Sequence, residues 1–262
     1  MAEEIVRIDK MEHSTSLRCV NQLTGRQQEL YWQFVKSISR LEKEVIPCTV
    51  MTKRDWSAIF LAIALDFPEF FYWNQYEIKR IQQNEDGIVC SFEMSYHYND
   101  RDLIRRKMNQ MSAMAKDILE QIITKGMTEA EMVRAVYDFL TLNLTYTNEK
   151  YQNGNSYPYA SYTLETLLNR VGVCEGISVT FLYLLRQLQI ECFGYASETH
   201  AWNVVKLGDL GDQHFFCDVT WDLRERENGR RYQYYMLTER QMRAKSHPDG
   251  DGVLFPGMRA YE

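Results

Sequence analysis

The feature that most constrains the fold of this chain is a change of hydrophobic period in its second half. Apolar residues recur at helical spacing directly after Cys174, and they are Ile177, Phe181, Leu184, Leu185 and Leu188. Two short runs rich in β-branched and aromatic residues follow, at 200–205 and 215–222. The first pattern predicts an amphipathic helix, and the other two predict strands. We therefore expect an α+β fold in which helices pack against an antiparallel sheet.

Cys174 differs from the other cysteines in its surroundings. It lies in the string Val171-Gly172-Val173-Cys174-Glu175-Gly176, immediately before the apolar stripe. We therefore expect it at or near the N-terminus of a buried helix. Unpaired N–H groups and the positive end of the helix dipole favour a thiolate over a thiol at such a position. We also expect Gly172 and Gly176 to let a substrate backbone approach the sulfur closely.

A histidine and an aspartate accompany the two strand-like runs. His200 opens the first run and Asp218 lies within the second, with a turn at 208–212 between them. Adjacent strands joined by a turn bring His200 beside Asp218, and a helix N-terminus packed across that hairpin completes a Cys–His–Asp set. In such a set the imidazole takes the thiol proton, while the carboxylate fixes its tautomer and stabilises the imidazolium. His214, on the same strand face as Asp218 by period-two counting, is an alternative partner.

Three strings in this region resemble the core motifs of a known family. Gly172-Val173-Cys174-Glu175-Gly176, His200-Ala201-Trp202-Asn203 and Asp218-Val219-Thr220-Trp221-Asp222 occur in that order, with the Cys, His and Asp 26 and 18 residues apart. They are similar to the strings of the transglutaminase-like superfamily, which is related in core architecture to papain-type cysteine proteases. The resemblance is strong over 128–247 and weaker over 50–125, where 66–71 is similar to the N-terminal extension of bacterial members.

The resemblance assigns a role to each matching residue. It implies Cys174 as the nucleophile, His200 as general base and acid, and Asp218 as the orienting carboxylate. The backbone N–H of Cys174 is then one oxyanion donor. The second donor stays open among four tyrosines, which are Tyr146, Tyr157, Tyr159 and Tyr162. Trp202 and Trp221 either wall the cleft or pack beside it.

The spacing of the cysteines excludes one class of metal site. They are Cys19, Cys48, Cys90, Cys174, Cys192 and Cys217. No two lie within four positions of each other, which rules out a zinc site of the C-x-x-C kind. We expect no metal and no cofactor. A chain of 262 residues builds its core without disulfides, so most of these thiols should be buried as small hydrophobic groups.

Charge and hydropathy exclude two further classes. With 30 basic and 36 acidic residues and a net charge of −6, the chain lacks the basic face that a general nucleic-acid binder needs. Its only basic run, 105–107, is interpreted as a solvated helix face. No apolar run reaches the roughly 18 residues that cross a bilayer, so we expect no membrane span. The first residues do not have the pattern of a signal peptide. The compartment and the oligomeric state stay open.

The N-terminal part is predicted to be rich in helices and to contain one hairpin. A helix starts at Thr52, with Asp55 as its capping partner, and ends at Asp66-Phe67-Pro68. After a turn at 84–87, an apolar set alternates with Val89, Ser91 and Glu93, which predicts a hairpin with one buried face. That set consists of Ile88, Cys90, Phe92 and Met94.

Two further helices are predicted around the centre of the chain. A core-facing stripe contains Ile104, Met108, Met111, Ala115, Ile118 and Ile122. Thr128 and Glu131 form a capping box for the second helix, whose inward face is Val133, Val136, Tyr137, Leu140 and Leu144. The composition changes around 125–126. We therefore predict an N-terminal extension over 1–125 and a transglutaminase-like catalytic core over 126–262.

Two interpretations of function follow. The first is a thiol-dependent acyl-transfer enzyme in which Cys174 attacks a peptide or glutamine-type amide of a protein or peptide substrate. Water then makes it a protease or amide hydrolase, whereas an amine makes it a transglutaminase. The alternative is a catalytically silent scaffold for protein or cell-surface binding. The presence of all three polar residues favours the enzyme, because a buried carboxyl without partners costs free energy.

Overall fold

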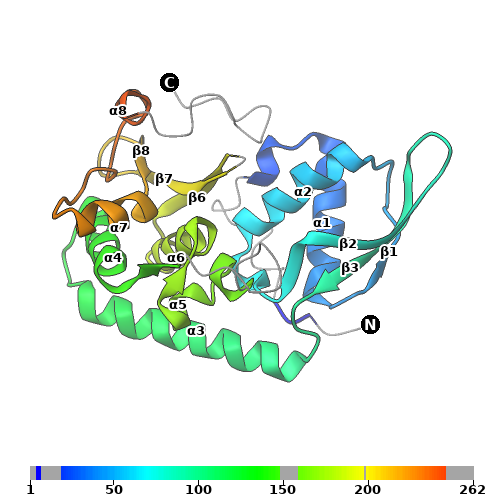
Figure 1. The fold of residues 1–262 in the computed structure, drawn as a ribbon, viewed down its shortest axis with the longest axis horizontal. Coiled ribbons are helices and arrows are strands. Elements are labelled where there is room, and N and C mark those ends of the chain that lie inside the picture. Colours follow the sequence, from blue (N-terminus) through cyan, green and yellow to red (C-terminus); the bar gives the residue numbers. More distant parts are fainter. Residues whose placement is uncertain (1–3, 7–18, 148–158, 198, 246–262) are drawn as a thin grey trace. The chain divides into compact units, whose positions relative to one another are not determined.

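The computed structural model describes residues 4–6, 19–147, 159–197 and 199–245. The fold is α+β, and the chain divides into two compact units, Met1–Met108 and Asn109–Glu262. Helix α3 (Arg101–Ile122) is continuous across this division (Figure 1). The predicted boundary at 125–126 lies instead in the turn that follows α3, where Gly126 has a φ of +93°. That boundary stays a prediction.

The first unit combines helices with a three-stranded antiparallel sheet in the order β1-β3-β2. Its elements are η1 (Cys19–Gln22), α1 (Gly25–Ser39), β1 (Glu44–Val45), α2 (Lys53–Asp66), η2 (Pro68–Phe70), β2 (Trp73–Gln83) and β3 (Val89–Tyr96). The predicted start and end of α2 are confirmed, since Thr52 is its N-cap and Pro68 follows its last turn.

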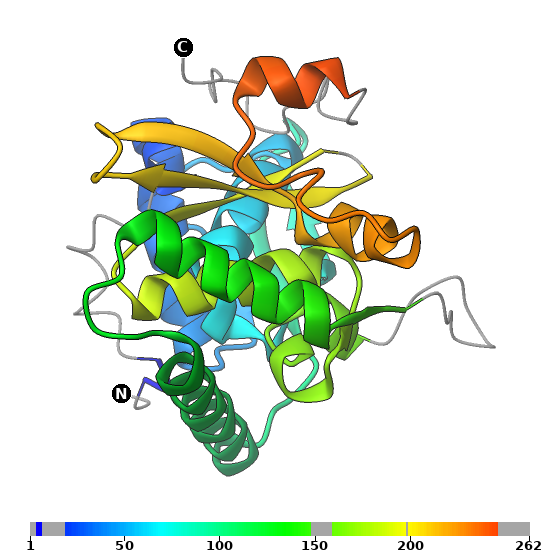
Figure 2. The ribbon, with the colours of Figure 1, turned by 90° about the vertical axis from the view of Figure 1, so that its left-hand side faces the viewer.

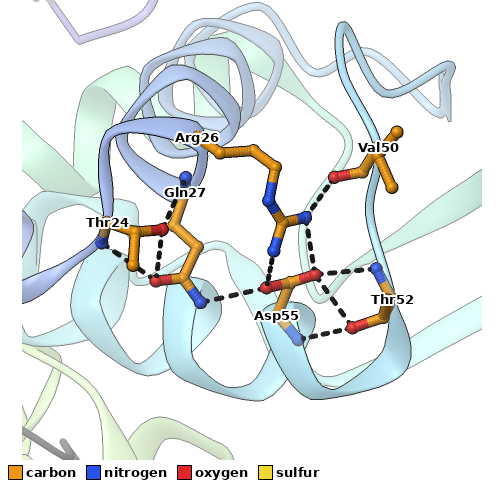
Figure 3. Close-up of polar contacts among 6 residues, drawn as sticks. All are labelled: Thr24, Arg26, Gln27, Val50, Thr52 and Asp55. Atoms are coloured by element: carbon orange, nitrogen blue, oxygen red, sulfur yellow. Dashed lines mark hydrogen bonds and ion pairs between the residues drawn. The ribbon is translucent and has the colours of Figure 1, made fainter.

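The two helix starts of the first unit are tied together through Asp55 (Figure 3). Asp55 Oδ2 accepts from the backbone N–H of Thr52, at 2.9 Å, and completes the capping box of α2. The same carboxylate accepts hydrogen bonds from both terminal nitrogens of Arg26, at 2.9 and 2.8 Å. It accepts another from Nε2 of Gln27, at 3.0 Å. Gln27 in turn belongs to the capping box of α1. These bonds lower the pKa of Asp55 to about 2, although burial acts in the opposite direction.

The hairpin β2–β3 is present, but its predicted alternation is wrong at one end. Val89 is buried and Cys90 is exposed, although Phe92 and Met94 are buried as expected. Gln82 pairs with Ser91 and Gln83 pairs with Val89, so Cys90 is an extra residue in β3. Such a bulge exchanges the two faces of a strand, which a count by two along the sequence does not detect.

The second unit is built around α6 (Cys174–Gln187). It further contains α4 (Glu129–Asn143), β4 (Thr145–Tyr146), η3 (Tyr159–Tyr162), α5 (Thr166–Asn169), β5 (Val171–Gly172), β6 (Glu191–Ala196), β7 (Ala201–Leu207), β8 (Gln213–Cys217), α7 (Val219–Glu227) and α8 (Glu239–Ala244). The antiparallel sheet has the order β6-β7-β8. Figure 2 shows its strands above α4.

Helix α6 is the central element of this unit. It packs against β6 and β7 and contacts α4, α5 and α7. Every residue from Gly176 to Leu185 is buried, so α6 is enclosed on all sides and not only along the predicted stripe. The capping box of Thr128 and Glu131 and the inward face of α4 are confirmed. The stripe of α3 is also buried, at Ile104, Met111, Ala115 and Ile118.

The second strand-like run of the sequence ends earlier than predicted. Strand β8 stops at Cys217, and residues 219–222 form the first turn of α7. The interpretation of these residues as strand is wrong because Asp218 caps a helix there: its carboxylate accepts the Trp221 N–H. Helix capping depends on this one polar contact, whereas the β-branched and aromatic composition indicated a strand.

The cysteines fall into three environments. Cys19, Cys192 and Cys217 are buried, Cys48 and Cys90 are exposed, and Cys174 is partly buried; none of these six described residues forms a disulfide. The expectation that most would be buried is therefore met by only half of them. Within the described residues, no helix is both long enough and apolar enough to cross a membrane.

Candidate active site

Cys174 is the first residue of α6. Val173, the N-cap, has an extended backbone and donates its N–H to the Ser161 carbonyl at 2.9 Å. The Val173 carbonyl accepts the N–H of Ile177 at 3.0 Å, which is the first bond of the helix. The N–H of Cys174 therefore lies in the first turn, where the helix supplies no partner and the dipole is positive.

The glycines beside Cys174 serve packing within the chain. A Cβ on Gly172 would lie 2.6 Å from Cγ2 of Thr166, and one on Gly176 would overlap the carbonyl oxygen of Ser161 and the Thr166 hydroxyl. Both positions are buried. The prediction that these glycines admit a substrate backbone is therefore wrong: the space that they leave is filled by the segment from Ser161 to Thr166.

His200 lies immediately before β7 and is held by a short turn. Its N–H donates to Ser197 Oγ at 3.2 Å, and its carbonyl accepts the Ser197 N–H at 2.8 Å. The imidazole Nε2 lies 2.6 Å from Oδ2 of Asp218. The side chains are 9% and 1% exposed, respectively, so this contact is shielded from water.

Asp218 is fixed at every polar group. Besides the contact with His200, its Oδ1 accepts the Trp221 N–H at 2.9 Å. Its backbone N–H donates to the Tyr234 carbonyl at 2.8 Å. Its own carbonyl accepts the hydroxyl of Tyr137, from α4, at 2.9 Å. The carboxylate therefore cannot turn away from His200 without breaking the start of α7.

A second buried carboxyl supports Asp218 from behind. Tyr137 Oη is 2.6 Å from Oδ2 of Asp222, and the Asp222 carboxylate also accepts the N–H groups of Gln233 and Tyr234. Burial raises the pKa of Asp222, although these hydrogen bonds oppose the rise. Burial likewise raises the pKa of Tyr137 well above its ordinary value. Neither Tyr137 nor Asp222 was singled out as a site residue from the sequence.

The imidazole of His200 joins Asp218 to Cys174. Nε2 faces Asp218, and the imidazole is also hydrogen-bonded to the side chain of Cys174. Burial alone lowers the pKa of His200, but the hydrogen bonds to Asp218 and Cys174 raise it to about 9. A histidine with a carboxylate on one side and a thiol on the other can take the thiol proton and hold it.

The two tryptophans of the motifs flank the imidazole. Trp202 stacks on His200 with the ring centroids 5.5 Å apart, and Trp221 is tilted against it at 6.0 Å. Trp202 is only 1% exposed, so its contact with the site is the stacking on the His200 ring. Trp221 is partly buried and packs on Tyr234. Both aromatic faces are placed where an imidazolium interacts favourably.

The tyrosines proposed as oxyanion donors lie on segments next to the start of α6. Tyr146 pairs with Gly172 between the parallel strands β4 and β5, and Arg224 covers its ring at 5.2 Å. Tyr159 and Tyr162 bound η3, which includes Ser161. Tyr157 lies outside the described residues.

The alternative histidine has a different setting. His214 pairs with Lys206 across the ladder and stacks on Phe193, while both carboxylate oxygens of Asp218 engage other groups, His200 and the Trp221 N–H. Over the part of the chain that the structure describes, no group of three or more His, Cys, Asp or Glu side chains is arranged to hold a metal ion.

Comparison with known proteins identifies the region that contains this site. The model of the transglutaminase-like superfamily matches residues 116–219. None of the curated proteins matches the chain. The crystal structure of a TGase shares 15% identity with a TM-score of 0.35, covering 55% of this chain and 43% of its own. A candidate cysteine protease from Cytophaga hutchinsonii shares 19% identity with a TM-score of 0.32, covering 55% and 61%.

This chain thus spans less than two thirds of the length of either structure, and likenesses at these scores carry no argument about fold or function. The family match stands without them, because its span contains Cys174, His200 and Asp218. Residues 116–219 are therefore similar to the transglutaminase-like superfamily, and the similarity concerns this part of the chain.

Proposed function

We propose that this chain is a thiol-dependent acyl-transfer enzyme that acts on peptide or glutamine-type amide bonds through an acyl-enzyme intermediate. Cys174 is the nucleophile, His200 the general base and acid, and Asp218 the orienting carboxylate. One observation carries the proposal: the imidazole of His200 is hydrogen-bonded to Asp218, at 2.6 Å, and to the Cys174 side chain. Packing alone gives no reason for three groups so distant in sequence to form one connected line.

In the first half of the reaction, the proton of the Cys174 thiol passes to the imidazole of His200. The sulfur then attacks the carbonyl carbon of the amide, and the π electrons of the C=O bond move onto oxygen. When this oxyanion collapses, the C–N bond breaks and the imidazolium proton passes to the leaving nitrogen. The product is a thioester on Cys174 and a free amine or ammonia.

The oxyanion needs donors that are in place before it forms. The backbone N–H of Cys174 is one, because it belongs to the first turn of α6. We assign the second to a tyrosine hydroxyl, with Tyr146 and Tyr162 as the candidates whose segments border the start of α6.

In the second half, water or a primary amine attacks the thioester carbonyl and gives its proton to His200. The C–S bond breaks, and the proton returns to the departing sulfur. Water makes the enzyme a protease or amide hydrolase, and an amine makes it a transglutaminase. In either case the partner is a protein or peptide that supplies the amide. During both halves, Asp218 and the faces of Trp202 and Trp221 stabilise the imidazolium.

The test is the pH dependence of Cys174 alkylation, which needs no substrate. The full chain is treated briefly with iodoacetamide at pH 6.5 and pH 9.5, and the cysteine peptides are quantified by mass spectrometry. Cys48 and Cys90 are exposed and serve as internal controls. At pH 6.5, below the ~8.5 at which a free thiol is half ionised, Cys174 should label at least about tenfold faster than in His200→Ala.

The labelling rates of Cys48 and Cys90 should be the same in both proteins. Slow labelling of Cys174 at pH 6.5, with no change in His200→Ala, would favour a catalytically silent scaffold. Once the reactivity of the Cys174 thiol is established, a second assay distinguishes water from an amine as the acyl acceptor. A glutamine-containing peptide is incubated with the full chain, with and without a fluorescent primary amine. Incorporation of the amine identifies transfer, and release of acid alone identifies hydrolysis.

A further inference from the structure

The helix that carries Cys174 and the strand that follows His200 are joined by two hydrogen bonds in opposite directions. Ser178 Oγ, in α6, donates to the carbonyl oxygen of Trp202, in β7, at 3.0 Å. Nδ2 of Asn203, in β7, donates to the carbonyl oxygen of Ser178 at 3.1 Å. Both side chains are buried, with 3% of Ser178 and 1% of Asn203 exposed.

The Asn203 amide also fixes a third element. Its Nδ2 lies 3.3 Å from the carbonyl oxygen of Phe193 in β6. Asn203 itself is in the central strand of the sheet, where its backbone pairs with Gly194 on one side and Cys217 on the other. The Asn203 amide that donates to α6 therefore belongs to a strand that pairs with a neighbouring strand on each side.

The positions of these residues relate them to the reacting groups. Ser178 is four residues after Cys174, so the two lie on the same face of α6, one turn apart. Trp202 and Asn203 are two and three residues after His200. A sliding or rotation of α6 against β7 that would separate the Cys174 sulfur from the imidazole must break both hydrogen bonds, and it would leave buried polar groups without partners.

We propose that Ser178 and Asn203 are positioning residues, which set the distance between the sulfur of Cys174 and the imidazole of His200. This inference rests on the proposed function of that pair. Neither residue touches the reacting atoms, and each acts through the element that carries one of them. The Asn203 of the His-Ala-Trp-Asn string thereby has a role that its place beside the histidine does not by itself explain.

The experiment compares variants by the ratio of Cys174 alkylation rates at pH 6.5 and pH 9.5 in the full chain. Ser178→Ala removes one hydroxyl, and Asn203→Leu removes the amide donors at similar volume. Thr180→Val is the matched control, because Thr180 is a fully buried hydroxyl of α6 that bonds only within its helix, to the Gly176 carbonyl at 2.7 Å.

We expect Ser178→Ala and Asn203→Leu to lower the rate at pH 6.5 by at least about fivefold. At pH 9.5, where a thiol ionises without help from the imidazole, their rates should stay within about twofold of the parent chain. Thr180→Val should retain the parent ratio. A merely structural role predicts a different result, since loosening of the fold exposes Cys174 and raises its labelling at both pH values.

Two failures can be told apart. If the parent chain already has the low ratio of His200→Ala, the proposed function fails. If the parent chain has the high ratio and a folded Ser178→Ala keeps it, the positioning role is overturned while the function stands. Far-ultraviolet circular dichroism and thermal melting establish folding in each case. Should Asn203→Leu not fold, the milder Ser178→Ala decides the question.

Discussion

At His200, two opposing effects act on one imidazole. Burial disfavours its charged form, whereas Asp218 and Cys174 favour it, and the balance puts its pKa at about 9. The ordinary value is ~6.5. Because folding raises this pKa, the stability gained from the imidazolium is fully present below about pH 6.5 and is lost as the pH rises through about 9. At neutral pH the ring is thus predicted to be protonated, and in the proposed mechanism the proton that it holds is the one taken from the Cys174 thiol.

This prediction is checked by following the imidazole proton resonances of the histidines against pH. We expect His200 to titrate near pH 9 in the parent chain. In Asp218→Asn the midpoint should fall toward 6.5 or below, because burial then faces one fewer opposing charge. His97 belongs to the other unit, and burial lowers its pKa. Its titration should not respond to the substitution. A parent midpoint near 6.5 would contradict the assigned network.

The residues identified from the sequence are those whose type is restricted by chemistry. Cys174, His200 and Asp218 stood out because few other residues serve as nucleophile, base and orienting carboxylate, and because they occur in recognisable strings. Tyr137 and Ser178 could not be found in this way. They act on backbone carbonyl oxygens of distant segments, and a hydroxyl on a helix carries no sign in the sequence of which carbonyl it will meet.

At the scale of elements, the packing of η3 and α5 against α6 decides where Cys174 lies. Ser161 accepts the N–H of Val173, and the Thr166 side chain fills the space beside two glycines. These short segments were not foreseen, because they bury only a few residues and have no periodicity. Helix α6, in contrast, is predicted from the long apolar stripe that follows Cys174.

Gly176→Ala tests this packing. Its Cβ would overlap the Ser161 carbonyl, which is backbone and cannot rotate away, so we expect a loss of about 1–3 kcal/mol in the free energy of unfolding. Gly208→Ala is the control in the same unit. There the Cβ lies 3.5 Å from the end of the flexible Glu129 side chain, and the change should stay within about 0.5 kcal/mol. Urea unfolding measures both, and equal effects would argue against a tight fit at Gly176.

The strand-like interpretation of 215–222 failed at the same scale for a related reason. The β-branched and aromatic residues of this run favour a strand both in β8 and after β8 has ended, so their composition does not show where the strand stops. The end of β8 is set by Asp218, whose carboxylate accepts the Trp221 N–H and so starts α7. The Asp218 side chain thereby both caps α7 and contacts His200. Neither contact can be predicted from the pattern of hydrophobic residues.

For the whole molecule, the division into two compact units predicts that a substitution in one unit destabilises that unit and not the other. Each unit has its own sheet and its own buried residues. In the first unit, Asp55 links the starts of α1 and α2. Because folding lowers its pKa to about 2, its contribution to stability is complete above about pH 4 and is lost as the pH falls through about 2. It is therefore fully present at neutral pH.

Hydrogen exchange of the full chain at neutral pH, read by mass spectrometry, compares a substitution in each unit. Asp55→Asn removes the charge that Arg26 faces, so it should weaken the protection of the amides in α1 and α2 by about 1–2 kcal/mol. The amides of α4 and α6 should keep their protection. Gly176→Ala should have the reverse effect, and the double variant should show the sum, since the two sites share no partner. Protection lost across both units in either single variant would mean that the chain unfolds as one cooperative body and that its two units are not separate in energy.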